Sequence, residues 1–394
     1  MSHKSTSKIG GRKGFTVRST AMTLPMVAVL TVWCCIASAQ TVETVTVGVA
    51  APLTGGNAEY GKDVENGVTV AINEANAKHL LIGGKPVNFV ILPEDDQADP
   101  KTGVAVAQQL VDKKVAFVVG HFNSGTSLPA SRLYEGAGIP MITPSSTNPA
   151  LTAQGFKTVF STIANDAQNA GYAGQYAVEV TKAKRIAVID DRTSFGQGEA
   201  DEFVKAVTTA HGNIVDREFT DNKAVDFSAQ LTTIKSKNAD LVYVAALNPQ
   251  APLIARRMKQ LGLRAQFLGG GGVVEESFLT LVGADAEGAM AWEYGEPIET
   301  LPGGAKFKTS YEQTFHTTML SYAPFSYDAA WAAIDAMQAA NSTDPAVFLN
   351  KLQMDTVKGI TGEIAFNANG SLKHPSSTLY KVEHGKWVPI VTKH

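Results

Sequence analysis

The sequence predicts an α/β protein built from two doubly wound, Rossmann-like lobes. Three observations support this fold class. Short β-rich runs alternate with longer helical segments, and this alternation restarts after about residue 160. The candidate strands are also continuous apolar runs, such as residues 116–119, as expected for parallel strands covered on both faces. Repeated strand–helix units of this kind favour parallel sheets flanked by helices.

Each element follows from its local pattern, since apolar runs predict strands and helical periodicity predicts the segments between them. In the first half, strands are expected at 45–51, 87–92, 115–119 and 140–143, with helices at 60–76, 101–112 and 126–136. In the second half, strands are expected at 185–190, 214–219, 240–245 and 265–268, with helices at 166–180, 196–210, 226–237 and 249–261.

The last hundred residues break this rhythm. Two helices, at 304–318 and 325–340, precede a β-rich tail at 362–366, 379–382 and 387–390. A chain that forms two sheets and then returns to complete both would join its lobes by several strands, which predicts a hinge. The expected division is residues 40–162 with 291–365 for lobe 1, and 163–290 with 366–394 for lobe 2.

The N-terminal residues 1–39 have the pattern of a secretory signal peptide. Five basic residues and no acidic residue precede an apolar run at 21–36, and Ala37-Ser38-Ala39 follows. The run is shorter than the roughly 20 residues of a spanning helix. Cys34 and Cys35 lie within it without a small residue directly before them, so no lipid anchor is expected. The predicted location is the periplasm, as a soluble protein.

Cleavage after Ala39 leaves 355 residues, no cysteine, and 29 basic against 37 acidic residues. Thiol catalysis, disulfides and cysteine-based zinc sites are thereby excluded. An acidic chain without a Lys/Arg stripe is a poor candidate for binding nucleic acid. The remaining length exceeds one ordinary hydrophobic core, which agrees with two lobes.

Two polar loops follow neighbouring predicted strands of the first lobe. They are residues 120–127, which contain Asn123 and Ser124, and residues 143–149, which contain Ser145, Ser146 and Thr147. Ligands of open parallel sheets sit at this edge. Hydroxyls and free backbone N–H groups near a helix N-terminus favour an anion, although serine and threonine also serve as ordinary helix caps there. We expect the two loops to bind a carboxylate together.

At these positions the chain resembles the leucine/isoleucine/valine-binding family, the type I periplasmic binding proteins of ABC transporters. The resemblance runs through almost the whole mature chain. It is carried by the ordered segments 47–61, 95–100, 120–124, 142–147, 226–228 and 361–362. The family implies the type I periplasmic binding protein fold, with a ligand held between the lobes.

The resemblance also implies roles for individual residues. Ser124 and Thr147 would bind an α-carboxylate, and the carbonyl group of Ser145 would accept from an α-ammonium. The apolar pocket would be lined from the first lobe by Tyr60, Phe122 and Tyr322. From the second lobe it would be closed by Phe195, where the family usually has tyrosine. A packing role remains the alternative for each aromatic residue.

One departure from the family concerns the amine of the ligand. The family places an acidic residue in the loop that here reads Gly269-Gly-Gly-Gly272, and Gly271 stands at the acidic position. A buried ammonium group without a carboxylate is costly. Three alternatives follow: Glu275, Glu276 or Glu293 takes this role, the ligand is an amine-free 2-oxo acid or aromatic acid, or water and carbonyl groups suffice.

Catalytic and cofactor motifs are absent from the sequence. The glycine run lacks the spacing of a dinucleotide site, and no phosphate-binding loop, serine elbow or close pair of metal-binding histidines occurs. His121 is expected to be structural, and of the adjacent Asp190 and Asp191 one at most would face the cleft. We therefore expect no enzyme and no cofactor.

The expected function is that of the substrate-binding component of an ABC importer. Hinge closure on a branched-chain or similar amino acid would shift the balance between open and closed forms. The resemblance implies a membrane permease and an ATPase as partners, and a monomer is expected. The alternatives are an amine-free carboxylate as ligand and a ligand-sensing module on the same scaffold.

Overall fold

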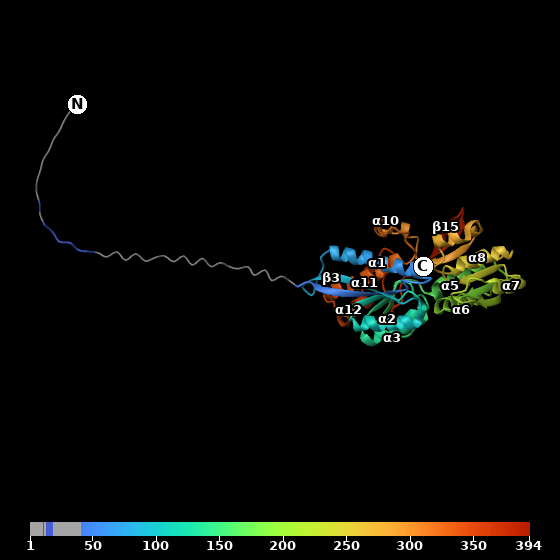
Figure 1. The fold of residues 1–394 in the computed structure, drawn as a ribbon, viewed down its shortest axis with the longest axis horizontal. Helices are drawn as coiled ribbons and strands as arrows, with labels where there is room; N and C mark the ends of the chain where they lie inside the picture. Colours follow the sequence, from blue (N-terminus) through green and yellow to red (C-terminus); the bar gives the residue numbers. More distant parts are fainter. Residues whose placement is uncertain (1–10, 12, 19–40) are drawn as a thin grey trace, which may run out of the picture. The chain divides into compact units, whose positions relative to one another are not determined.

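The computed structural model describes residues 11, 13–18 and 41–394 (Figure 1). Of the predicted signal peptide, residues 1–39, all but residues 11 and 13–18 lie outside the described residues. Residues 41–394 contain two large sheets, and each is covered by helices on both faces. None of the helices in the described part of the chain is long and apolar enough to cross a membrane.

The first sheet has the strand order β2-β3-β1-β4-β5-β6. Its strands are β1 (Glu43–Ala51), β2 (Leu81–Ile82), β3 (Lys85–Asp95), β4 (Phe117–Gly120), β5 (Met141–Thr143) and β6 (Val159–Ser161). Apart from the antiparallel β2–β3 hairpin, neighbouring strands are parallel. Strand β1 lies between β3 and β4, so the strand order reverses there. Ligands of such sheets bind at the carboxyl ends of the strands beside this reversal.

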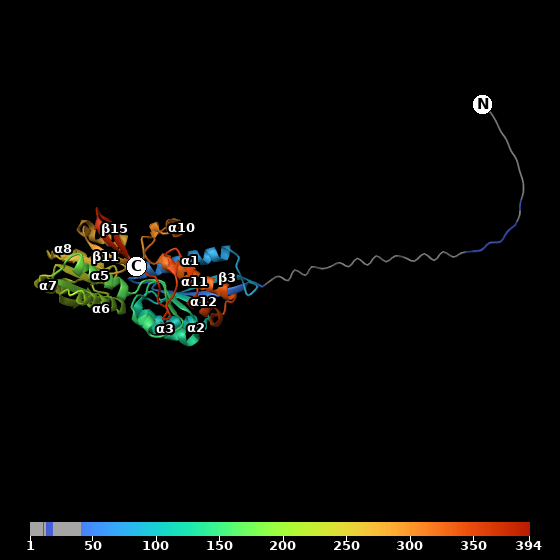
Figure 2. The same ribbon diagram turned by 180° about the vertical axis from the view of Figure 1, so that it is seen from behind.

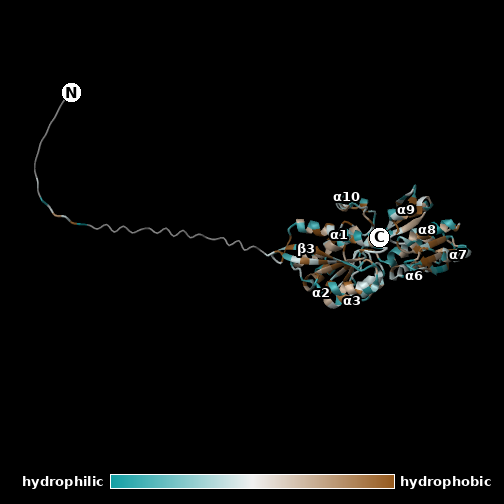
Figure 3. Ribbon diagram, in the orientation of Figure 1, coloured by the Kyte–Doolittle hydropathy of each residue, from teal (hydrophilic) through white to brown (hydrophobic). Residues whose placement is uncertain are grey.

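Two helix layers enclose this sheet (Figure 1). One contains α1 (Ala58–Ala77) and α11 (Ala323–Ala340), and the other α2 (Pro100–Asp112) and α3 (Ser124–Ala137). Three further helices complete the lobe: α4 (Ala150–Ala153), α10 (Gly304–Phe315) and α12 (Pro345–Met354). Apolar colouring runs along the strands, whereas the helices carry both colours (Figure 3), as expected for strands buried on both faces.

The second sheet has the order β15-β14-β11-β10-β9-β7-β8. Its strands are β7 (Ile186–Asp190), β8 (Ile214–Phe219), β9 (Leu241–Ala245), β10 (Gln266–Gly269), β11 (Met290–Tyr294), β14 (Ser377–Glu383) and β15 (Lys386–Lys393). The two C-terminal strands pair antiparallel at one edge, and the others are parallel. Strand β7 lies between β8 and β9, where the order again reverses.

Helices cover both faces of this sheet as well. One layer contains α5 (Asp166–Glu179) and α6 (Ser194–Thr209). The other contains α7 (Ser228–Ser236), α8 (Gln250–Gln260) and α9 (Glu276–Val282). Helices α5 to α8 gather at the end of the folded unit opposite β3, as the view from behind also shows (Figure 2). The predicted class of two doubly wound lobes is thus confirmed.

The chain passes between the lobes three times, around residues 162–165, 295–303 and 373–376. Two of these connections bond to each other. The backbone N–H of Gly295 donates to the carbonyl of Ser376 at 2.8 Å, and the hydroxyl of Thr378 donates to the carbonyl of Gly295 at 2.7 Å. These crossings form the hinge that the tail pattern predicts.

The strand pairing moves two of the predicted lobe boundaries. The prediction assigned residues 291–365 to lobe 1, but β11 pairs with β10 and β14 in the second sheet. Residue Phe366, assigned to lobe 2, forms a bridge with Leu372 and packs in the core of the first lobe. The chain therefore crosses between the lobes after Tyr294 and before Ser377. The predicted bounds differ because the apolar pattern of a segment does not show which sheet its strand joins.

Candidate functional site

The predicted site residues lie at the carboxyl ends of strands from both sheets. Phe122 and Ser124 follow β4, Thr147 follows β5, Phe195 follows β7 on helix α6, and Gly271 follows β10. All the predicted residues are buried except Asn123, which is half-buried. The fold therefore brings the two polar loops of the first lobe against the second lobe.

Contacts across the cleft show the lobes closed on each other. The Tyr60 hydroxyl donates to the carbonyl of Gly272 at 3.0 Å, and Asn148 Nδ2 donates to the carbonyl of Ser194 at 2.6 Å. The Ser321 hydroxyl donates to Glu275 Oε1 at 2.9 Å. Each bond joins the first lobe to the second, which is the closed arrangement expected of a hinge protein.

Three aromatic side chains of the first lobe form one cluster. Tyr60 and Phe122 stack with ring centroids 5.5 Å apart, and Tyr322 meets both rings edge-on. Asp63 holds Tyr322 in place, because its buried carboxylate accepts from the backbone N–H groups of Tyr322 and Ala323 at the start of α11. The rings thus pack as core, and Tyr60 and Tyr322 also face Gly272 of the second lobe.

Some hydroxyl groups of the two polar loops form hydrogen bonds within the protein, and others have no partner there. The Ser145 hydroxyl donates to the carbonyl of Phe122 at 3.1 Å, and Thr143 Oγ1 accepts from the backbone of Ser146 at 2.9 Å. In contrast, Ser146 Oγ and Thr147 Oγ1 are buried and have no hydrogen-bond partner within residues 41–394. Ser124 Oγ only accepts, from the Asn148 backbone at 3.4 Å. Donors for an anion therefore remain at this edge.

The glycine loop between β10 and α9 explains why Gly271 carries no acidic side chain. A Cβ atom on Gly271 would lie 2.1 Å from the ring of Tyr294, and one on Gly270 would lie 2.1 Å from Glu199 Oε1. Tyr294 and Glu199 therefore occupy the space that side chains of this loop would need. The backbone N–H of Gly271 donates to Glu199 Oε1 at 3.0 Å.

Four further candidate site residues were not predicted from the sequence: Glu199, Asp166, Tyr243 and Tyr294. Asp166 begins helix α5, where an acidic residue is ordinary, and Tyr243 and Tyr294 lie within strands. A signal did exist for Glu199, since it stands four residues after Phe195 on the same face of helix α6. All four side chains are buried.

Burial dominates the electrostatics of these carboxyl groups. It raises the pKa of Asp166 and that of Glu199. The charge of Glu202 further raises the pKa of Asp166, and the charge of Asp166 further raises the pKa of Glu199. The hydroxyls of Thr147 and Tyr294 partly offset this for Asp166, although neither makes a hydrogen bond of ordinary geometry with its carboxylate. Burial also raises the pKa of Glu293 to about 7. The closed cleft therefore favours a positive charge beside these groups.

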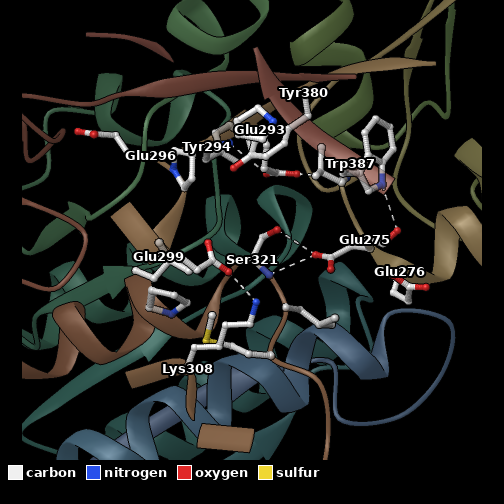
Figure 4. Close-up of a pocket in the computed structure, with 18 of the residues that line it drawn as sticks. Glu275, Glu276, Glu293, Tyr294, Glu296, Glu299, Lys308, Ser321, Tyr380 and Trp387 are labelled. Atoms are coloured by element: carbon white, nitrogen blue, oxygen red, sulfur yellow. Dashed lines mark hydrogen bonds and ion pairs between the residues drawn. The ribbon is translucent and has the colours of Figure 1, made fainter. Parts of the chain in front are cut away.

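The three glutamates that the sequence offers as alternatives to an acidic residue at position 271 lie elsewhere. Glu275, Glu276 and Glu293 line a cavity of about 490 Å³ beside the hinge, together with Tyr380 and Trp387 (Figure 4). Glu275 accepts from Ser321, and Glu293 accepts from the backbone of Gly272 at 2.9 Å. These two carboxylates thus bind groups of the chain itself.

The remaining polar candidates are structural. His121 lies between Asp96 and Tyr134, with Nδ1 2.8 Å from the carboxylate and Nε2 3.0 Å from the hydroxyl, as expected for a satisfied histidine. Asp190 pairs with Arg217 at 3.2 Å, and Asp191 accepts from the backbone of Thr193. Across the described residues, no group of three or more His, Cys, Asp and Glu side chains is arranged to hold a metal ion.

Comparison with known proteins identifies the family. A family model described as periplasmic binding protein matches residues 44–386. The Leu/Ile/Val-binding protein homolog 1 of Brucella suis is 35% identical over 86% of this chain and 91% of its own length. A leucine-, isoleucine-, valine-, threonine- and alanine-binding protein of Pseudomonas aeruginosa is 32% identical over 86% of this chain and 90% of its own.

Solved structures share the fold. A leucine-binding protein of Thermotoga maritima has a TM-score of 0.81 at 27% identity and covers 88% of this chain and 98% of its own. A solute-binding protein of Rhodopseudomonas palustris in complex with 3,4-dihydroxybenzoic acid has a TM-score of 0.79 over 89% and 97% of the two chains, and at 21% identity the likeness is one of fold. The resemblance that the sequence motifs carry is confirmed: this chain belongs to the periplasmic binding protein family.

Proposed function

We propose that this protein is the substrate-binding component of an ABC importer and closes on a branched-chain or similar amino acid. The observation that carries the proposal is the set of free, buried hydroxyls at the edge of the first sheet, which the second lobe covers. Buried polar groups normally have partners, so Ser146 and Thr147 indicate a ligand with acceptor oxygens. The relatives named as Leu/Ile/Val-binding proteins support an amino acid.

Closure is the proposed mechanism. The ligand carboxylate binds the first lobe through Ser124, Ser146 and Thr147, and Phe195 of the second lobe closes over the ligand side chain. Contacts made only in the closed form shift the equilibrium by their differential affinity. Moving it from 1:99 to 99:1 takes about 5.5 kcal/mol, which a few charge-assisted hydrogen bonds and buried methylene groups can supply.

The same proposal covers the location of the protein and its partners. Residues 1–39 act as a cleaved signal peptide, and the mature chain acts in the periplasm as a monomer that binds no nucleic acid. The closed form docks on a membrane permease driven by an ATPase. The names of the relatives describe binding proteins, which agrees with the expectation that the chain is not an enzyme.

Calorimetric titration of the ligand-free protein tests the ligand class. The titrants are leucine, 2-oxoisocaproate and 4-hydroxybenzoate, and we expect leucine to bind tightest. The fold-level neighbour with 3,4-dihydroxybenzoic acid makes an aromatic acid the rival ligand. Tight binding of an amine-free acid together with no heat from leucine would overturn the amino-acid assignment and leave the binding-protein assignment intact.

A further inference from the structure

Two carboxyl groups of the second lobe lie buried in the closed cleft with unused acceptor atoms. Glu199 and Asp166 are both fully buried. Glu199 Oε2 and both carboxylate oxygens of Asp166 have no hydrogen-bond partner in the part of the chain that the structure describes. The hydroxyl of Tyr243 acts on Glu199, and those of Thr147 and Tyr294 act on Asp166, but none of them makes a hydrogen bond of ordinary geometry. Buried acceptors left in this state are costly, and a donor supplied from outside the chain would satisfy them.

The backbone around Glu199 is shaped to admit its carboxylate. Gly270 has no side chain where the carboxylate lies, and the N–H of Gly271 fixes Oε1 and leaves Oε2 free. Helix α6 also approaches the first lobe closely, since a Cβ atom on Gly198 would lie 2.5 Å from Asn148 Nδ2 and 3.5 Å from Asp166 Oδ2. Glu199 and Asp166 are thus held together at the point where the lobes meet.

The surroundings of the pair lack a balancing positive charge. No ion pair among the described residues includes Asp166 or Glu199. The ionisable groups that act on them are all acidic or phenolic: Glu202, Glu293, Tyr243, Tyr294 and Tyr322. An anionic group would be repelled here, and a cation that donates hydrogen bonds fits.

We infer that Glu199 and Asp166 bind the ammonium group of the ligand and thereby supply the counter-charge that Gly271 lacks. This inference rests on the proposed amino-acid ligand and deepens it. It sets the ligand's orientation, with the carboxylate at Thr147 of the first lobe and the ammonium toward helices α5 and α6 of the second. Closure of the lobes then brings the ammonium group against these two carboxyl groups. An α-amino acid is therefore preferred over the same acid without its amine.

The other candidate acidic residues are less suited to this role. Glu293 accepts from the backbone N–H groups of Gly272 and Tyr294, and Glu275 accepts from Ser321 across the hinge cavity (Figure 4). Glu276 is exposed at the start of α9. Of the acidic alternatives, only the Glu199–Asp166 pair combines full burial with free acceptors at the cleft.

The test compares leucine with 4-methylpentanoate, the same skeleton without the amine, by calorimetry on the mature chain. Glu199→Gln keeps the size of the side chain and an acceptor for Gly271 but removes the charge. We expect leucine affinity to fall about 100-fold or more, as for a buried ion pair that loses one partner, while 4-methylpentanoate binds as well as before or better. Asp166→Asn should shift the preference in the same direction.

The matched control is Asp201→Asn, which removes an exposed carboxylate of the same helix α6, where it pairs with Arg217 at 2.6 Å. It should leave both affinities within about twofold, since exposed pairs contribute little. Leucine binding that is unchanged in both Glu199→Gln and Asp166→Asn would overturn the inference while the proposed function stands. A parent protein that binds 4-methylpentanoate and rejects leucine would overturn both the inference and the proposed amino-acid ligand.

A pH series on the parent protein needs no variant and stays decisive if Glu199→Gln does not fold. When the lobes close on an acid without an amine, Glu199 and Asp166 are buried without a positive charge beside them, so they take up protons. The affinity for 4-methylpentanoate should therefore fall as pH rises from 6 to 8. The slope approaches about tenfold per pH unit for each proton taken up. Leucine affinity should stay level, because the ammonium supplies the positive charge. Equal slopes for the two ligands would contradict the inference.

Discussion

At the residue scale, the polar loops of the first lobe hold two kinds of hydroxyl. Ser145 and Thr143 use theirs within the protein, to the carbonyl groups of Phe122 and His121. Ser146 and Thr147 are equally buried and make no such bond within residues 41–394. Adjacent residues of one type in one loop therefore have different roles, and only the free ones are available to a ligand.

Replacing Thr147 by valine should weaken any carboxylate ligand, with or without an amine. A hydrogen bond to a charged group contributes about 1.5–3 kcal/mol, so leucine and 4-methylpentanoate should both lose roughly 10- to 150-fold in affinity by calorimetry. Thr209→Val, at an exposed site on helix α6, is the control. An unchanged affinity in Thr147→Val would show that the carboxylate binds elsewhere.

At the element scale, the glycine loop after β10 leaves space for side chains of other elements. Glu199 lies where a Cβ of Gly270 would be, Tyr294 where that of Gly271 would be, and Leu247 and Tyr322 where that of Gly272 would be. The loop backbone is held by Glu293, which accepts from Gly272. Gly270, Gly271 and Gly272 thus leave room for side chains from both lobes to meet at one point.

Gly271→Ala should disrupt this packing, because the added methyl group would lie 2.1 Å from the Tyr294 ring. We expect a loss of about 1–3 kcal/mol in the free energy of unfolding, as for overpacked cores, and weaker leucine binding. Gly171→Ala on helix α5, with open space around the new Cβ, should instead stabilise by about 0.5–1 kcal/mol. Denaturant unfolding and calorimetry measure both effects, and similar stability in the two variants would refute this account of the loop.

Local pattern predicts most elements near their true bounds but misses some. The predicted strand 214–219 coincides with β8, whereas β6 and β11 were not expected. Strand β6 has three residues, and β11 carries Glu293 among apolar residues. The carboxylate of Glu293 is tolerated there because backbone N–H groups of a distant loop satisfy it. Such compensation leaves no trace in the local sequence.

At the scale of the whole molecule, buried carboxyl groups within the first lobe make stability depend on pH. Burial raises the pKa of Asp63 and that of Asp328 from 3.8 to about 6. A carboxyl group with a raised pKa binds its proton more tightly in the folded chain than in the unfolded chain. Its stabilising effect is therefore complete below about pH 3.8 and is lost as pH rises through about 6.

We accordingly expect the free energy of unfolding to receive a smaller contribution from Asp63 and Asp328 at pH 7.5 than at pH 4.5. A shift of one pKa unit corresponds to about 1.4 kcal/mol, so each group contributes up to roughly 3 kcal/mol of pH dependence. Urea unfolding of the parent protein and of Asp328→Asn measures the slope, and the variant should show a flatter one. An equal slope in the variant would contradict this origin.

The sequence by itself determined the two-lobed α/β architecture, the hinge and the polar loops of the first lobe, because these follow from short-range periodicity and from loops next to their strands. Only the tertiary structure decided where the acidic groups of the cleft lie. Glu199 and Gly271 are 72 positions apart and meet through the backbone N–H of the glycine loop. Which carboxylate enters the cleft depends on how the helices of the second lobe pack on its sheet, and no local pattern encodes that distance.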